Sequence, residues 1–245
     1  MLVTCWSAKG GSGTTVVAAA SALTAADSPP VRRTASRTAS RGTIGRAPGT
    51  PRVLLVDLAG HQPACLGLPE PSGPGIAEWL RADAETPTDA LVRMEVPVGP
   101  GLDLLPRGEG PLECHRASLL IQVLAASRRT VVVDGGRPDL DELAHRFAVE
   151  ADRSVAVTRL CLLGLRALNG APVRPSGVVV LREVGRAIGV GDVVSMIGAP
   201  VVADVAVDPS IARAVDAGLL SSRLPRSFAA AVAPVASRSM VTSVD

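Results

Sequence analysis

The sequence predicts an α/β fold in which a doubly wound, mostly parallel sheet of about seven or eight strands is flanked by helices. Short apolar runs without strict alternation recur along the chain, as in strands that are buried on both faces. Stretches with helical character separate these runs, so strand and helix alternate. Hydrophobic residues make up 47% of the 245 residues, which is sufficient for one sizeable core.

The expected strands are rich in Val and Leu. They cover residues 2–6, 53–56, 130–133, 154–157, 177–181 and 200–205, with 102–106 as a weaker candidate. The expected helices cover residues 13–25, 74–82, 88–93, 116–127, 139–150, 161–169, 189–197 and 210–219. Together these elements predict a single domain over residues 1–236.

Two segments differ from the rest in composition. Residues 27–51 are rich in Ser, Thr, Pro and Arg, contain the near-repeat RTASRTAS and lack apolar periodicity. We interpret them as a flexible, solvated insertion, whose arginines could also touch an anionic surface. Residues 237–245 are expected to be a disordered tail.

The composition argues against several classes of function. Aromatic residues are only 2%, which leaves little for stacking on exposed bases, and a net charge of +2 does not imply a polyanionic partner. We therefore expect no specific nucleic-acid partner. The four cysteines and three histidines show no metal-ligand spacing, and no secretory signal or 18-residue apolar run is present. A reducing, cytoplasmic location is the default expectation.

The chain has a single lysine among its 25 basic residues, Lys9, and it lies in a glycine-rich segment. The arginine bias indicates a GC-rich genome. A tight phosphate site favours the compact ammonium of lysine over a guanidinium, so the survival of Lys9 suggests a role there.

The segment SAKGGSGTT, residues 7–15, follows the first expected strand and opens the first expected helix. Phosphates bind at such junctions, because backbone N–H groups converge there at a helix N-terminus. The expected phosphate-binding residues are Lys9, Gly10, Gly11, Ser12, Gly13, Thr14 and Thr15, and Thr15 also occupies the Mg²⁺-ligand position. Against the GxxxxGK[ST] template, however, Ala8 replaces the first glycine and Thr14 the lysine. A tight turn without a ligand is the alternative interpretation.

Two aspartates, Asp57 and Asp134, each end an apolar strand, at the edge of a parallel sheet where ligands bind. Each could instead be a helix N-cap or a turn residue. Asp208, followed by Pro209, has the pattern of an N-cap with proline at the first helical position.

Several motifs resemble those of the MinD/ParA group of P-loop ATPases, over about residues 1–225. AKGGSGTT is similar to the deviant loop KGGxGK[ST], in which Lys9 matches the characteristic front lysine. RVLLVDLAGHQP resembles a strand ending in Asp-x-Asp, with Asp57 at the first position and Ala59 at the second. TVVVDGGRP and PVVADVAVDPSIARAVDAGLL are similar to later motifs of the group. The form KGGxGTT most resembles the CpaE/TadZ branch, whose members localise pilus-assembly machinery.

The resemblance implies a P-loop ATPase-like domain that binds ATP or ADP with Mg²⁺. Lys9 would reach the partner's phosphates across a nucleotide-sandwich homodimer, and Lys9 and Asp57 are the candidate catalytic residues. Thr15 would ligate Mg²⁺, with Asp134 acting through water, while Asp208 would lie near the adenine. Arg182 occupies a position where the family often has a base-reading asparagine.

The departures at Thr14 and Ala59 both affect hydrolysis, so the resemblance implies a degenerate ATPase with little turnover. The implied role is positional or scaffolding, with an envelope-machinery or secretion-ATPase partner of a pilus or secretion system. The alternatives are a nucleotide-free scaffold and an ATPase that only a partner activates. A peripheral position at the inner membrane face, through a partner, is compatible with this role.

Residues 219–237 are the candidate for direct membrane contact, because MinD relatives attach through a C-terminal amphipathic helix. Arg223, Arg226 and Phe228 favour such contact. Pro225 and Pro234 are expected to interrupt the helix, and its apolar face is mostly alanine, so direct contact is only weakly supported.

Overall fold

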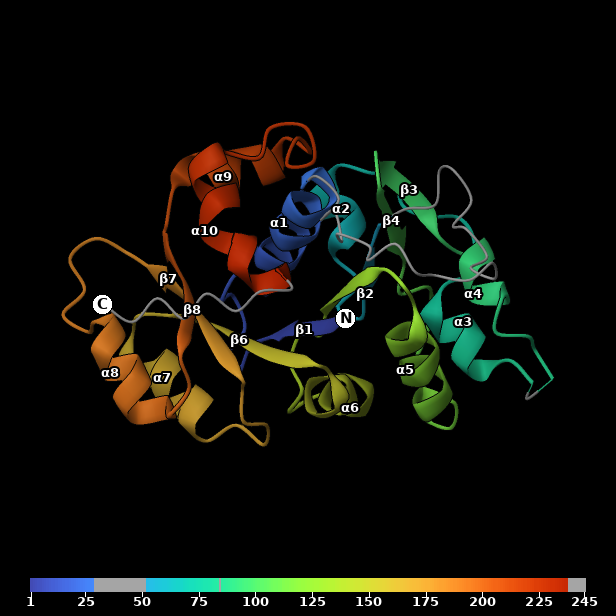
Figure 1. Cartoon of the computed structure of the whole chain (residues 1–245), viewed down its shortest axis with the longest axis horizontal. Coiled ribbons are helices and arrows are strands. Elements are labelled where there is room, and N and C mark those ends of the chain that lie inside the picture. Colours follow the sequence, from blue (N-terminus) through green and yellow to red (C-terminus); the bar gives the residue numbers. More distant parts are fainter. Residues whose placement is uncertain (29–51, 84, 238–245) are drawn as a thin grey trace, which may run out of the picture.

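The computed structural model describes residues 1–28, 52–83 and 85–237. The described chain contains an eight-stranded sheet in the order β3-β4-β2-β5-β1-β6-β7-β8, with helices on both faces (Figure 1). This architecture confirms the predicted fold class. The predictions for 29–51 and 238–245 concern segments outside the described residues.

The strands match the predicted runs, with one addition. They are β1 (Leu2–Trp6), β2 (Val53–Asp57), β3 (Val96–Gly99), β4 (Leu102–Leu105), β5 (Thr130–Asp134), β6 (Arg153–Arg159), β7 (Gly177–Arg182) and β8 (Val201–Ala206). All neighbouring pairs are parallel except β3 and β4, which are antiparallel. The carboxyl ends of the seven parallel strands therefore meet at one edge of the sheet.

The helices connect these strands. They are α1 (Thr14–Asp27), α2 (Gln62–Leu66), α3 (Ile76–Arg81), α4 (Ala90–Arg93), α5 (Ala117–Ala126), α6 (Glu142–Glu150), α7 (Leu162–Asn169), α8 (Val190–Ile197), α9 (Pro209–Asp216) and α10 (Arg226–Ala236). α1 continues through Asp27, two residues beyond the end of the helix expected over residues 13–25.

Each central strand contributes side chains to both faces, which explains its unbroken apolar sequence. In β1, Val3 and Cys5 belong to the core beneath α1 and α10, whereas Leu2 and Trp6 belong to cores on the opposite face. The opposite face is covered by helices that include α5, α6, α7 and α8 (Figure 1). Strict alternation of polar and apolar residues is absent because neither face of the sheet meets water.

Neither β3 nor α2 was predicted from the sequence, because neither carries a strong periodic signal. β3 is four residues long, half exposed and contains Pro97, which suits an edge strand that pairs on one side only. α2 spans five residues and begins with Gln62 and Pro63, so its apolar pattern is too short to indicate a helix.

The expectation that both prolines interrupt the C-terminal helix is wrong for Pro234, whereas Pro225 does limit the helix, which begins at Arg226. Pro225 is the N-cap of α10, where a missing N–H costs no intrahelical bond, and Pro234 lies in the last turn. Phe228, Val232 and Val235 are buried in the core shared with α1. The apolar face of α10 is therefore occupied within the fold.

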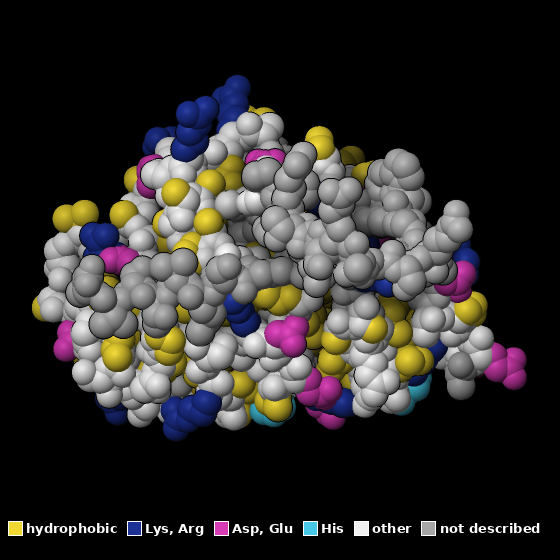
Figure 2. All heavy atoms as spheres, viewed as in Figure 1, with side chains coloured by type: hydrophobic (Ala, Val, Ile, Leu, Met, Phe, Trp, Pro, Cys, Tyr) yellow, Lys and Arg dark blue, Asp and Glu magenta, His cyan; other side chains and the backbone are white. Residues whose placement is uncertain are grey.

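The surface around α9 and α10 carries several exposed arginines. Figure 2 shows basic side chains projecting from the end of the molecule that carries these helices, and the exposed arginines of this region include Arg213, Arg223 and Arg226. In the described part of the chain no helix combines the length and the apolar character that crossing a bilayer requires.

We predict that Val232→Ala lowers the free energy of unfolding by about 2 kcal/mol, because it removes two buried methyl groups and leaves a cavity between α10 and α1. Val232 is fully buried, whereas Arg226 in the same helix is exposed. Urea denaturation measures both variants. An Arg226→Ala control should stay near wild type, and equal stability of the two variants would contradict the docking of α10.

Candidate functional site

A glycine-rich loop connects β1 to α1 and is open towards solvent at its centre. Gly11 has φ +73° and Gly13, the N-cap of α1, has φ +83°, so both adopt the left-handed region that favours glycine. A Cβ atom at Gly13 would also lie 2.7 Å from Leu181 Cδ1. The Ser12 hydroxyl donates to the carbonyl of Lys9 at 2.6 Å. The loop thus presents backbone N–H groups at a helix N-terminus, as an anion site requires.

Two aspartates lie beside this loop at the carboxyl ends of neighbouring strands. Asp57 of β2 and Asp134 of β5 are partners in the parallel register, and neither is exposed to solvent. Asp57 accepts backbone N–H bonds from Gly60 at 2.7 Å and from Gln62 at 2.9 Å. Asp134 accepts from the Gln62 side chain at 3.0 Å and from the Gly136 N–H at 3.3 Å.

Burial raises the pKa of Asp134 to about 6, and the neighbouring carboxylate of Asp57 contributes to this rise. Hydrogen bonds from Thr15, Gln62 and Gly136 act in the opposite direction. Burial also raises the pKa of Asp57, against three backbone N–H groups that lower it. No Lys or Arg among the described residues forms an ion pair with either group, so the site is short of positive charge.

Gln62 links the parts of the site. Its backbone N–H bonds Asp57, while its side-chain Nε2 donates at 3.0 Å both to Asp134 and to the carbonyl of Thr15 in α1. The side chain is fully buried, yet its Oε1 atom has no hydrogen-bond partner within the described structure. Gln62 was not among the residues predicted from the sequence; its spacing of five residues from Asp57, before a proline, was the available signal.

The residues present fit a magnesium ion bound with a phosphate. Mg²⁺ prefers oxygen ligands, and the Thr15 hydroxyl and the Asp134 carboxylate supply them at the foot of the loop. The unpaired Gln62 Oε1 is an acceptor for a water molecule on such an ion. When bound, the ion would neutralise phosphate charge and offset the two buried carboxylates.

A cavity of about 280 Å³ begins at Gly13 and extends between α1, α9 and α10. Its walls are mostly apolar, and its charged lining residues are Arg159, Asp208 and Asp216. A second cavity, of about 630 Å³, opens at Thr15 and is lined in part by His61. The first cavity joins an apolar wall to the loop, which suits a nucleoside whose phosphates lie on the loop.

The other predicted residues lie around this centre. Lys9 is exposed at the rim of the loop. Thr14 is buried, and its hydroxyl has no partner among the described residues. Asp208 caps α9 by accepting the Ser210 N–H at 2.7 Å, which confirms its predicted capping role. Arg182 does not line the cavity and instead pairs with Asp204 at 3.0 Å.

No protein-family model and no curated protein sequence matches the chain. Several solved structures match its fold. The MinD cell division protein of Aquifex aeolicus has a TM-score of 0.72 at 19% identity, covering 100% of this chain and 99% of that one. A ParA family ATPase from Chlorobium tepidum has a TM-score of 0.69 at 18% identity, covering 96% and 99%. MinD of Pyrococcus horikoshii, complexed with Mg-ADP, has a TM-score of 0.68 at 16% identity, covering 96% and 95%.

The eight-stranded, mostly parallel sheet with a glycine-rich loop after its central strand β1 defines the fold of a P-loop NTPase. Within that class, the agreement over nearly the whole length of both chains shows that the fold is that of the MinD/ParA ATPases.

We predict that Asp134→Asn stabilises the metal-free protein at pH 8. The raised pKa means that the protonated form of Asp134 fits the fold better, so its contribution is fully present below pH 4 and is lost as pH rises through about 6. The whole loss amounts to about 3 kcal/mol, of which about 1.5 kcal/mol falls between pH 5 and pH 8. Urea denaturation at pH 5 and pH 8 should show a smaller drop for the variant. An Asp27→Asn control, at an exposed site, should follow wild type; equal drops in all three proteins would contradict the prediction.

We predict that Gln62→Met lowers the free energy of unfolding by about 2 kcal/mol, because it keeps the side-chain volume but removes the hydrogen bonds that Gln62 Nε2 donates to the Thr15 carbonyl and to the buried Asp134 carboxylate. Chemical denaturation measures the change. Gln122 is exposed on α5, so Gln122→Met is the matched control and should have little effect. A Gln62→Met variant as stable as this control would contradict the linking role of Gln62.

Proposed function

We propose that the protein is a MinD/ParA-like positional or scaffolding factor that binds ATP or ADP with Mg²⁺ and hydrolyses little. The observation that carries the proposal is the open loop 7–13 beside two buried carboxylates that lack a cation. A nucleotide with Mg²⁺ supplies both the anion that the loop amides suit and the cation that the carboxylates suit.

Three structures of the same fold support nucleotide binding by analogy. MinD of Pyrococcus horikoshii is complexed with Mg-ADP, a putative plasmid partition protein of Borrelia burgdorferi is bound to AMPPNP, and a substituted form of Cyanothece McdA is in complex with ATP. Fold analogy alone does not establish a ligand. The additional support comes from this chain, in which Thr15, Asp134 and Gln62 provide oxygen atoms at the foot of the loop.

Weak hydrolysis follows from two side chains. Thr14 has no charge to place against the phosphates, and Ala59 has no carboxylate to orient water. Phosphoryl transfer depends on such positioning and electrostatic stabilisation, so each loss removes orders of magnitude in rate. Both oxygens of Asp57 accept backbone N–H groups, which favours a structural role for this residue over a catalytic one.

A dimer and a protein partner complete the proposal. Lys9 is exposed beside the loop and can reach the phosphates of a second copy, as the family resemblance implies. MinD of Aquifex aeolicus forms a complex with MinC. By analogy, this homodimer acts as a CpaE/TadZ-type factor on an envelope-machinery or secretion-ATPase partner, from the cytoplasmic side of the membrane. A nucleotide-free scaffold and a partner-activated ATPase are the alternatives.

We predict saturable binding of fluorescent ATP that Mg²⁺ strengthens. Fluorescence titration with and without Mg²⁺ measures it, and an absence of saturation at millimolar nucleotide would favour the nucleotide-free scaffold. Gly13→Ala should weaken binding at least about tenfold, because the Cβ is strained at φ +83° and meets Leu181. The matched control is Gly73→Ala, whose Cβ would meet nothing within 4 Å and which should bind like wild type.

A further inference from the structure

Arg159 lies beside the glycine-rich loop although the two are far apart in sequence. β6 pairs in parallel with β1, with Ala156 level with Trp6, the last residue of β1. Arg159 is three residues further along β6, which places it about 10 Å beyond Trp6 at about 3.3 Å per residue. At that level β1 has ended and the glycine-rich loop has begun. Consistent with this placement, Arg159 and Gly13 line the same 280 Å³ cavity.

The guanidinium of Arg159 is held in place but is not neutralised. Its NH1 group pairs with Glu183 Oε1 at 2.6 Å, and the other Glu183 oxygen accepts from Arg186 Nε at 2.8 Å. Two arginines thus share one carboxylate, and the cluster keeps a net positive charge. In the described structure the other N–H groups of Arg159 have no protein acceptor.

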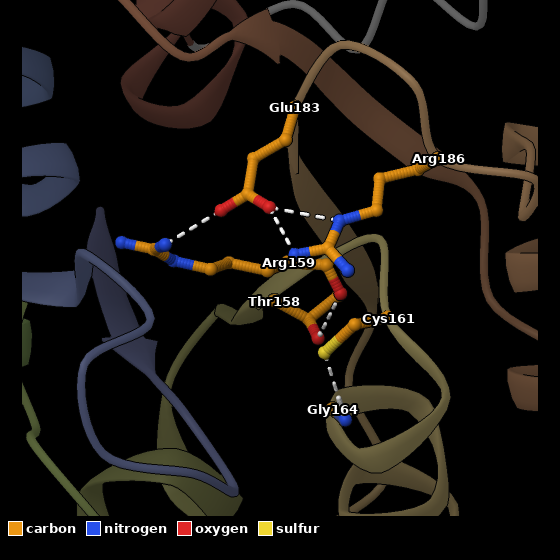
Figure 3. A network of polar contacts seen from close by, with 6 residues as sticks. All are labelled: Thr158, Arg159, Cys161, Gly164, Glu183 and Arg186. Atoms are coloured by element: carbon orange, nitrogen blue, oxygen red, sulfur yellow. Dashed lines mark hydrogen bonds and ion pairs between the residues drawn. The ribbon is translucent and has the colours of Figure 1, made fainter. Parts of the chain in front are cut away.

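Figure 3 shows the direction of this side chain. Arg159 extends from β6 with its guanidinium on the side where the blue ribbon of β1 and its loop passes, while Arg186 approaches Glu183 from the opposite side. The Arg159 side chain is 46% exposed, so its free N–H groups are accessible to a ligand. The Arg159 guanidinium therefore lies on the side of β6 that faces the loop.

The loop itself needs such a cation. Its lysine position holds Thr14, whose buried hydroxyl has no partner among the described residues. Arg159 is the one cationic residue that lines the described cavity beginning at Gly13, and no cationic residue lines the described cavity at Thr15. A single Mg²⁺ would offset only part of the negative charge where phosphates lie beside two buried carboxylates, so a further cation at this cavity is favourable.

We propose that Arg159 binds the phosphates of a nucleotide on the loop and takes the place of the cation that Thr14 does not supply. A guanidinium donates two parallel N–H bonds to phosphate oxygens, and its planar fork suits this contact. Glu183 fixes the direction of Arg159, and Arg186 offsets the charge of Glu183. The inference rests on the proposed nucleotide binding and assigns one residue of that site.

Titration of fluorescent ATP with Mg²⁺ tests the proposal on wild type, Arg159→Ala, Arg159→Lys and Arg174→Ala. Arg159→Ala should weaken binding about ten- to a hundredfold, the effect of losing a charge-assisted hydrogen bond. Arg159→Lys should retain part of the affinity. Arg174→Ala is the matched control, because Arg174 is exposed, lies outside the Glu183 cluster and lines neither cavity, and the variant should stay within about threefold of wild type.

A salt series separates a phosphate contact from a contact with the base. The affinity of wild type should fall more steeply with added salt than that of Arg159→Ala, because screening weakens the contact between guanidinium and phosphate. Melting curves verify that each variant folds.

Binding by Arg159→Ala that equals wild type, equal losses in Arg159→Ala and Arg174→Ala, or identical salt dependence would each overturn the inference and leave nucleotide binding intact. An absence of binding by wild type would instead remove the proposed function, and this inference with it.

Discussion

The rest of the site depends on two carboxylates that face each other in adjacent strands without contact with water. Asp57 and Asp134 are level in the register of β2 and β5, and burying like charges at such proximity disfavours ionisation of both. The chain relieves the cost with N–H groups: the backbone after β2 turns back onto Asp57, and that turn begins α2 and brings Gln62 against Asp134. The positive charge that the pair still lacks favours the binding of a cation at this site.

In the function that we propose, different groups of the site serve nucleotide binding and nucleotide hydrolysis. Backbone N–H groups of the loop and the oxygens of Thr15 and Asp134 suit a phosphate with its Mg²⁺, and these groups are retained. The weak hydrolysis that we propose rests on Thr14, which carries no charge, and on Ala59, which has no carboxylate. The cations that remain, Lys9 and Arg159, stand at the rim of the loop on long side chains. Their position suits contact with the phosphates of a nucleotide or with a second copy, which fits the proposed role of the nucleotide in assembly.

The sequence predicted the features that depend on local pattern. Strands buried on both faces appear as Val-rich runs, and the loop and the aspartates that end β2 and β5 follow from motif and position. Features that depend on tertiary contacts were missed. α10 carries Pro234, and its Phe228, Val232 and Val235 are buried against the alanine-rich α1. Gln62 is recognisable only when β2, β5 and α1 are seen together. From the sequence, Arg159 is interpreted by default as an ordinary exposed arginine. Only the register of β6 on β1 shows that it lies beside the loop.

A crystal structure determined with ATP and Mg²⁺ tests the central claim most directly. The account predicts phosphates on the amides of residues 10–15, the ion between Thr15 and Asp134, and the base in the cavity that begins at Gly13. A loop that stays empty at saturating nucleotide, or a nucleotide bound elsewhere on the chain, would contradict it.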